Sequence, residues 1–304
     1  MSTSEPRTEI RSFLKWPGGK RWLVPVVLPI IRSRLKGKYI EPFLGGGSVF
    51  FALQPACALL SDINPEIITV YRHVRDRPRL LIDKLKSIRV SEEVFYRLRA
   101  SQPRTALLRA IRFLYLNRTA FSGLYRVNSR GRFNVPYGGG ERRPDILWVN
   151  ELLVNASGAL RRAQLLNADF EEVIARASSG DVVYCDPTYT VTHNNNGFRR
   201  YNENNYSWND QERLAQAARR AAARGATVIV SNAHHDEIRA LYSPHIPIVL
   251  ERSSTVAPKV KWRRRVSEFL FVIHPQPSMQ RVAKLNTISI RQRCAAANQE
   301  DSRV

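Results

Sequence analysis

The feature that most constrains the fold is a glycine-rich turn, FLGGG at Phe43–Gly47, which follows a short strand predicted at Lys38–Glu41. Glycines at such a turn let the backbone approach a bound nucleoside, because no side chain obstructs it. A helix predicted at Ser48–Leu53 and a strand at Ala58–Ser61 complete a β-α-β unit that ends at Asp62. A carboxylate about 16 residues after the glycines is close to the position that meets a ribose diol in nucleotide-binding folds. The pattern therefore predicts a nucleoside site with Asp62 as the ribose contact.

A second motif, DPTY at Asp186–Tyr189, follows a strand predicted at Asp181–Cys185. A carboxylate, a proline carbonyl and an aromatic face at the end of a strand can hold a planar base by its exocyclic amine. An isolated DPTY is usually an ordinary turn. Together with the glycine turn and the SDIN segment at Ser61–Asn64, in this order, it indicates methyl transfer to an amino nitrogen.

Length and composition favour a globular protein. The 304 residues are 43% apolar, which is enough to bury a substantial core, in one or two lobes. No run of about 18 apolar residues occurs, and Met1–Arg11 is polar, so we expect neither a membrane span nor a secretory signal. Cys57, Cys185 and Cys294 are few and far apart, which argues against a disulfide framework and a zinc site. We expect a cytoplasmic location.

The charge indicates a polyanionic partner. The chain has 48 Lys and Arg against 26 Asp and Glu, a net charge of +22. Residues 72–162 hold 20 basic and 7 acidic residues, which leaves +13 of that excess in one stretch. We expect the main docking surface there. Charge alone leaves open a basic surface that only aids solubility or binds nucleic acid loosely.

The middle of the chain differs from the ends. Apolar residues at helical spacing, interrupted by basic ones, predict helices at Leu80–Ile88, Glu92–Arg99, Thr105–Asn117 and Leu147–Arg162. A basic β-hairpin is predicted at Phe121–Gly140 around a turn at Asn128–Gly131. Later strands are predicted at Gln164–Leu166, Val182–Cys185, Thr227–Ser231 and Phe269–Ile273, with a helix at Gln211–Ala223. We therefore expect a catalytic domain in two parts, 1–70 and 161–275, a helical insertion at 71–160 with its hairpin at about 120–140, and a loosely ordered tail at 276–304.

Five segments together resemble one protein family. They are LKWPGGK at Leu14–Lys20, EPFLGGGSVF at Glu41–Phe50, SDIN at Ser61–Asn64, FLYLNR at Phe113–Arg118 and FNVP at Phe133–Pro136. With them the chain resembles the Dam-like DNA adenine-N6 methyltransferases, the alpha group of the D12 class. The resemblance implies an α/β fold with a doubly wound, Rossmann-like methyltransferase sheet that uses S-adenosylmethionine. It also implies an inserted helical target-recognition domain that carries a β-hairpin and binds double-stranded DNA.

The resemblance also implies cofactor contacts. Trp16 and Lys20 would pack against and hydrogen-bond the methionine tail, while Phe170 would offer an apolar wall to the adenine of the cofactor. The full implied set is Trp16, Lys20, Phe43, Gly45, Gly47, Asp62, Asp169, Phe170 and Asp186.

The implied catalytic residues are Asp186, Pro187 and Tyr189. The amine of adenine is a poor nucleophile, so acceptance of its hydrogens by the Asp186 carboxylate and the Pro187 carbonyl would favour the reactive pyramidal form. Tyr189 would stack on the base, which must first leave the duplex. We expect no metal, because the sulfonium donor is already activated. Thr188 stands where the family usually has a second proline, and we still expect an active enzyme because Pro187 is kept.

Sequence specificity is expected in the hairpin. The resemblance places Phe121 as an aromatic wedge, and Lys15, Leu124, Arg126 and Pro136 at base edges. Arg126 suits bidentate recognition of guanine, and an apolar contact suits a thymine methyl, which together suggest GATC. The family usually has a tyrosine where this chain has Phe121, and a basic segment where it has glycines at 138–140, so the exact site stays a hypothesis.

Two other functions stay open from the sequence. An RNA amino-methyltransferase would share the cofactor chemistry, and a catalytically degenerate protein would bind S-adenosylmethionine or DNA without transferring a methyl group. The sequence also leaves open whether the protein is paired with a restriction endonuclease.

Overall fold

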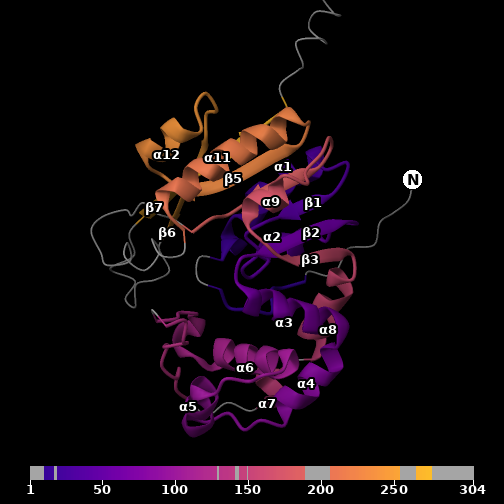
Figure 1. Cartoon of the computed structure of the whole chain (residues 1–304), viewed down its shortest axis with the longest axis vertical. Coiled ribbons are helices and arrows are strands. Elements are labelled where there is room, and N and C mark those ends of the chain that lie inside the picture. Colours follow the sequence, from indigo (N-terminus) through magenta and orange to yellow (C-terminus); the bar gives the residue numbers. More distant parts are fainter. Residues whose placement is uncertain are drawn as a thin grey trace, which may run out of the picture.

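The computed structural model describes residues 10–16, 19–128, 130–140, 144–148, 150–188, 206–253 and 265–275. Within these residues, seven strands form one sheet with the order β3-β2-β1-β4-β5-β7-β6 (Figure 1). The strands are β1 (Tyr39–Glu41), β2 (Ala58–Asp62), β3 (Ala163–Asn167), β4 (Val182–Cys185), β5 (Thr227–Ala233), β6 (Ile248–Ser253) and β7 (Arg265–Ile273).

The strand order reverses between β1 and β4. Strands β1 to β5 pair in parallel, and β7 is antiparallel to both β5 and β6. From β1 the chain builds the sheet outward through β2 and β3, and then returns to add β4 on the other side of β1. In open α/β sheets, ligands bind outside the carboxyl ends of the strands at such a reversal. The topology therefore predicts a ligand site at the carboxyl ends of β1, β2 and β4.

Helices cover both faces of the sheet (Figure 1). One face is covered by α1 (Val24–Arg34), α2 (Ser48–Leu53) and α3 (Pro65–Asp76), and the other by α9 (Phe170–Ile174), α11 (Trp208–Ala223) and α12 (Asp236–Leu241). Successive strand residues alternate between the two cores, because side chains of a strand point to opposite faces. Tyr39 and Val182 pack in the first core, while Ile40 and Val183 pack in the second. The doubly wound α/β prediction is confirmed.

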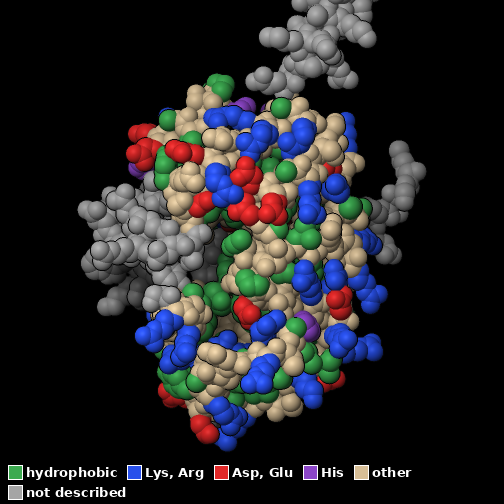
Figure 2. Space-filling view, viewed as in Figure 1, with side chains coloured by type: hydrophobic (Ala, Val, Ile, Leu, Met, Phe, Trp, Pro, Cys, Tyr) green, Lys and Arg blue, Asp and Glu red, His purple; other side chains and the backbone are tan. Residues whose placement is uncertain are grey.

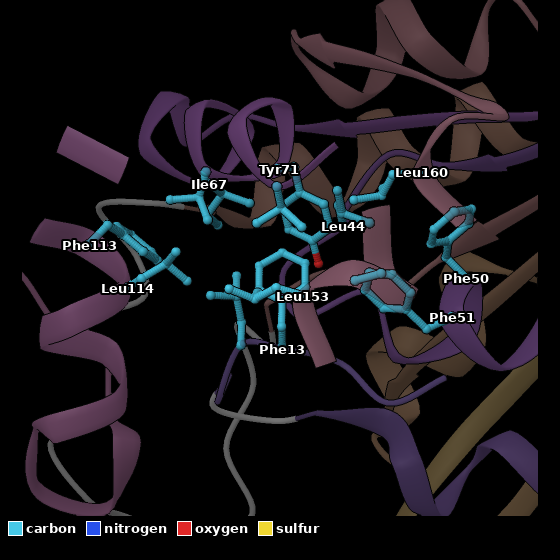
Figure 3. Close-up of a cluster of buried hydrophobic side chains, with 14 of the residues drawn as sticks. Phe13, Leu44, Phe50, Phe51, Ile67, Tyr71, Phe113, Leu114, Leu153 and Leu160 are labelled. Atoms are coloured by element: carbon cyan, nitrogen blue, oxygen red, sulfur yellow. The ribbon is translucent and has the colours of Figure 1, made fainter. Parts of the chain in front are cut away.

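A helical part lies below the sheet in Figure 1. It contains α4 (Pro78–Lys86), α5 (Glu92–Ala100), α6 (Ala106–Thr119), α7 (Pro144–Leu147) and α8 (Asn150–Leu160). The side chains of Ser91 and Thr105 cap α5 and α6 by accepting hydrogen bonds from backbone N–H groups three residues later. Phe113 and Leu114 of α6 join the same buried cluster as Phe51 of α2 (Figure 3). The helical part and one face of the sheet therefore share a core.

The predicted hairpin is present as an irregular antiparallel pair. Isolated bridges join Ala120 to Tyr137 and Val127 to Phe133. Around its tip, the N–H of Asn128 donates to the carbonyl of Arg132 at 2.8 Å. The pair begins with a short 3-10 turn, η2 (Phe121–Gly123), which directly follows α6. The hairpin is thus an extension of α6 and not a separate sheet.

Several elements are not predicted from the sequence, including α3, α7, α9, α12 and β6. Helix α3 contains Ile67, Ile68 and Val70, whose branched side chains favour strands. All three are buried, and burial outweighs their low helix propensity. The boundary expected between residues 70 and 71 falls inside this helix.

Phe13 tests how far the shared core stabilises the fold. Its ring lies 5.8 Å from that of Phe51 and 4.9 Å from that of Tyr71, and it is buried. We expect Phe13→Ala to lower the free energy of unfolding by about 3 to 5 kcal/mol, from lost burial and the cavity left behind. Urea denaturation measures this. Leu108→Ala, at a position that is 51% exposed, is the control and should stay within about 0.5 kcal/mol of the wild type; equal losses in both variants would contradict the prediction.

Candidate active site

The residues expected to bind the cofactor and the base converge at the reversal in strand order. The glycine turn follows β1, Asp62 ends β2, and Asp186 follows β4. These strands are neighbours in the sheet, with β1 between the other two. The structure therefore brings together the two motifs that lie far apart in the sequence.

Two positions of the turn require glycine. Gly45 and Gly47 have positive φ angles of 44° and 64°. A Cβ at Gly45 would lie 2.7 Å from Cδ1 of Trp16, and one at Gly47 would lie 2.8 Å from the hydroxyl of Tyr71. That hydroxyl donates a 3.1 Å hydrogen bond to the carbonyl of Gly45. The turn is therefore packed closely between Trp16 and Tyr71, and its three glycines are buried.

Asp62 is oriented by the backbone. Its Oδ2 accepts a hydrogen bond from the N–H of Gly45, and its Oδ1 accepts one from the N–H of Asn64, both at 2.9 Å. Burial raises the pKa of Asp62 to about 6, although both hydrogen bonds oppose the shift. Each carboxylate oxygen can accept a further hydrogen bond, so the side chain suits a diol.

An aromatic wall stands beside the turn. The rings of Phe43 and Phe170 stack at 5.2 Å, and Tyr206 lies 5.8 Å and 6.0 Å from them. The guanidinium of Arg213 lies over the ring of Phe170, 4.8 Å from its centroid, and pairs with Asp169 at 2.8 Å. Sequence analysis gives neither Tyr206 nor Arg213 a place beside the glycine turn, because only the packing of α11 and the residues just before it against α9 brings them here.

A buried lysine connects two carboxylates. Lys20, in the 3-10 turn η1 (Lys20–Trp22), places its Nζ 3.2 Å from Oδ1 of Asp186 and 2.8 Å from Oε2 of Glu268. The side chains of Lys20 and Glu268 are 6% and 2% exposed. The hydroxyl of Ser231 donates to the same Oδ1 of Asp186 at 2.8 Å. Glu268 and Ser231 are missed by the sequence analysis, although a glutamate within the apolar strand β7 is a signal that could have identified the first.

Burial also shapes the titration of Asp186. It raises the pKa of this carboxyl above the usual range, and the charge of Lys20 opposes the increase. Lys20 therefore favours the ionised form, which accepts hydrogen bonds. Pro187 is buried and Thr188 is exposed, while Tyr189 lies outside the described residues.

Glu41 is a further buried carboxyl at the end of β1. It is 3% exposed, and the hydroxyl of Tyr39 donates to its Oε2 at 2.8 Å. Burial raises the pKa of Glu41 to about 8, against the effect of the Tyr39 hydrogen bond and with a contribution from the charge of Asp186. At neutral pH this carboxyl is therefore largely protonated.

The residues expected to contact bases lie on the hairpin and beside it. Phe121 and Leu124 are 55% and 40% exposed, so both apolar side chains are available to contact a partner. Pro136 is also exposed, and its carbonyl accepts a 3.0 Å hydrogen bond from the N–H of Phe121. Nε of Arg126 donates to Oδ1 of Asn134 at 2.8 Å.

Lys15 lies next to this group. It is exposed, and a Cβ on Gly123 would lie 2.4 Å from its Cδ. Figure 2 shows Lys and Arg side chains spread over the visible face, with Asp and Glu gathered in fewer places. Behind the hairpin, a cavity of about 440 Å³ is lined partly by Arg109, Arg130 and Arg132. The hairpin side of the molecule thus combines exposed apolar tips with positive charge.

Among the described residues, no cluster of three or more His, Cys, Asp or Glu could hold a metal ion. In the same part of the chain, no helix is long and apolar enough to cross a bilayer. His234 hydrogen-bonds Ser267 at 2.8 Å and packs on Phe269. Cys57 is exposed and Cys185 is buried.

The known proteins that this chain resembles are DNA methyltransferases. A family model described as D12 class N6 adenine-specific DNA methyltransferase matches residues 16–256. The type II methyltransferase M1.LlaDCHI of Lactococcus lactis subsp. cremoris is 33% identical over 274 residues, which cover 87% of this chain and 95% of that protein. The DNA adenine methylase of Vibrio cholerae O1 is 36% identical over 280 residues, covering 89% and 98%. That of Escherichia coli K12 is 32% identical over 274 residues, covering 87% and 96%.

The titration of Glu41 predicts how stability depends on pH. Its pKa is raised from 4.5 to about 8, so between these values the native state keeps a proton that the unfolded chain releases. The free energy of unfolding should therefore fall as the pH rises through this window. In Glu41→Gln this contribution is absent, and we expect a smaller decrease between about pH 5 and about pH 8, measured by urea denaturation. Glu92→Gln, at an exposed position, is the control; a wild-type pH profile in Glu41→Gln would contradict the assignment.

Proposed function

Because the chain belongs to the D12 class of N6 adenine-specific DNA methyltransferases, we propose that it transfers a methyl group from S-adenosylmethionine to N6 of an adenine extruded from duplex DNA. The observation that carries this proposal is the Asp186–Pro187 pair at the end of β4, where Lys20 and Ser231 hold the carboxylate beside the glycine turn.

The residues around the glycine turn fit the cofactor. Gly45 and Gly47 let the turn pack closely on Trp16 and Tyr71, and Asp62 offers fixed acceptor oxygens for the ribose hydroxyls. The stacked Phe43 and Phe170 offer an apolar face to the adenine of the cofactor.

Charged and aromatic groups would hold the rest of the cofactor. Asp169 caps α9 and pairs with Arg213 at the edge of the aromatic wall. Trp16, Lys20 and Asp186 would meet the methionine tail, whose amino and carboxyl groups need partners of both signs. When bound, the cofactor supplies a methyl group that its sulfonium already activates.

The chain contributes to the reaction mainly by holding the amine. The ionised Asp186 and the carbonyl of Pro187 accept the two N6 hydrogens, which withdraws the nitrogen lone pair from conjugation with the ring. A buried carboxylate that is already fixed by Lys20 and Ser231 needs little rearrangement when the amine arrives. Tyr189 would stack on the base. Alignment of the amine with the methyl group then accounts for much of the rate.

The adenine must leave the duplex before its N6 can reach the active site. In the duplex, N6 is engaged in base pairing and lies inside the stack, away from any pocket. Phe121 is a large apolar side chain that stays more than half exposed on the hairpin, next to the exposed Pro136. Such a side chain can fill the space that an extruded base leaves.

The hairpin would read the sequence around the target. Arg126 is suited to guanine, and Leu124 with Pro136 to a thymine methyl, with Lys15 as a further base contact. The hydrogen bond from Arg126 to Asn134 directs the guanidinium and leaves other N–H donors available. These contacts support GATC as the proposed site. The basic side chains of residues 72–162 would meet phosphates, which fixes the register on the duplex.

Two wider aspects of the function belong to the same proposal. DNA as the substrate supports a cytoplasmic location. Pairing with a restriction endonuclease is supported by the likeness to a type II methyltransferase. The RNA alternative is disfavoured by the family and by the exposed hairpin, and competition between duplex DNA and structured RNA for the enzyme would separate the two.

The proposed chemistry predicts a strong effect of Asp186→Ala. Loss of a fixed acceptor for the amine should lower the rate of methyl transfer by about 100- to 1,000-fold. The measurement is incubation with labelled S-adenosylmethionine and unmethylated DNA, followed by nucleoside analysis for N6-methyladenine. Asp83→Ala, which removes an exposed aspartate of α4, should leave the rate unchanged. Undiminished turnover of Asp186→Ala, or a different product, would refute the mechanism.

Recognition by the hairpin predicts a loss of selectivity in Arg126→Ala. Without the guanine contact, discrimination at one base pair should fall by about 1 to 3 kcal/mol, or roughly 5- to 150-fold. Sequencing of methylated adenines in a host without adenine methylation would show the relaxed position. Arg130→Ala, exposed at the hairpin tip, should weaken binding to all duplexes alike. Full selectivity in Arg126→Ala would count against its role as a reader.

A further inference from the structure

Trp16 lies between the glycine turn and the hairpin. On one side its ring is so close to Gly45 that a Cβ there would lie 2.7 Å from Cδ1 and 2.8 Å from Nε1. On the other side its ring stacks on that of Tyr125, with the centroids 5.2 Å apart and the planes at 27°. One side chain therefore contacts both the turn that would hold the cofactor and the hairpin that would read DNA.

The backbone around Trp16 connects the same two places. The N–H of Lys15 donates to Oδ1 of Asn117 at 2.9 Å, and Nδ2 of Asn117 donates to the carbonyl of Lys15 at 2.7 Å. Asn117 is fully buried in α6, directly before the hairpin. At the other end of the segment, the hydroxyl of Ser12 hydrogen-bonds the carbonyl of Gly46. Residues 12–16 thus form a strap that is hydrogen-bonded to the glycine turn at one end and to α6 at the other.

Tyr125 connects this strap to α6 and to the hairpin through its ring contacts. Its ring also lies 5.0 Å from that of Phe113 in α6 and 5.7 Å from that of Phe133 on the opposite side of the hairpin. In the chain it stands between Leu124 and Arg126, the two residues that would meet base edges. The packed ring restrains the backbone of Tyr125, from which the adjoining Leu124 and Arg126 side chains extend.

We propose that Tyr125 is a positioning residue that couples cofactor binding to DNA recognition through its stack on Trp16. The proposal rests on the proposed function. Binding of the cofactor against the glycine turn fixes Trp16, Trp16 fixes Tyr125, and Tyr125 holds Leu124 and Arg126 for the bases. By thermodynamic reciprocity, DNA that engages these residues must strengthen cofactor binding by the same factor. If the stack of Tyr125 on Trp16 forms fully only when one ligand is bound, the affinity for the other ligand should change by roughly two- to twelvefold.

The test measures the affinity for S-adenosylhomocysteine by calorimetry, with and without a short duplex that the wild-type protein methylates at one adenine. The variants are Tyr125→Phe, which keeps the stacking ring, and Tyr125→Leu, which removes it. The control is Tyr137→Leu, because Tyr137 is another hairpin tyrosine and packs on Phe95 of α5, away from Trp16. We expect DNA to tighten ligand binding in the wild type, in Tyr125→Phe and in Tyr137→Leu. In Tyr125→Leu we expect weaker binding without DNA and a loss of most of the enhancement.

Three outcomes would overturn the coupling. They are an unchanged enhancement in Tyr125→Leu, an equal loss in Tyr137→Leu, and a Tyr125→Phe variant that behaves like Tyr125→Leu. If Tyr125→Leu does not fold, the coupling can be measured from the other side with Trp16→Leu. In the wild type, saturating S-adenosylhomocysteine should raise the affinity for the same duplex by about twofold or more, and this increase should be lost in Trp16→Leu; an equal increase in both proteins would refute the proposal. A wild-type protein that methylates no DNA would instead refute the proposed function, so the two failures are distinguishable.

Discussion

The ion pairs of the buried Lys20 with Asp186 and Glu268 hold the site together. In a dry interior each of these charges is costly without its partners, so the three side chains constrain one another. Glu268 reaches this place because β7 pairs with β5, where Ala233 lies opposite it, and β5 pairs with β4. The antiparallel strand β7 therefore helps to fix the carboxylate of Asp186, which follows β4.

The parts of the site that the sequence predicts are those encoded locally. Gly45 and Asp62 belong to one β-α-β unit, so spacing along the chain is enough to bring them together. Glu268 is 248 residues from Lys20, and only the strand order makes them neighbours. Tyr206 likewise reaches Phe43 through the packing of α11 on α9. No local pattern encodes such contacts, which is why they are missed.

The helical part is more closely joined to the sheet than a separate recognition module would be. Phe13, Tyr71 and Phe113 belong to one buried cluster that runs from the sheet face into α6 (Figure 3). Helix α3 packs against β2 and β3 of the sheet and against α6 and α8 of the helical part. The sequence does not predict this helix, because its branched residues favour strands in isolation. The existence of the insertion is predictable from helical periodicity and basic charge. Its shared core is not, because periodicity shows which face is apolar but not what the face packs against.

The ion pairs of Arg213 make the packing of α9 against α11 sensitive to ionic strength. Arg213 pairs with Asp169, Glu171 and Asp210 while lying over Phe170, and it joins α9 to α11 beside the aromatic wall. These pairs are about a third exposed, so dissolved ions screen them. Attraction between a basic surface and phosphates weakens under the same conditions, because counterions released into a more concentrated salt solution gain less entropy. Rising ionic strength therefore weakens both the aromatic wall of the proposed nucleoside site and the attraction of the basic surface to a polyanion, and a dilute electrolyte favours both.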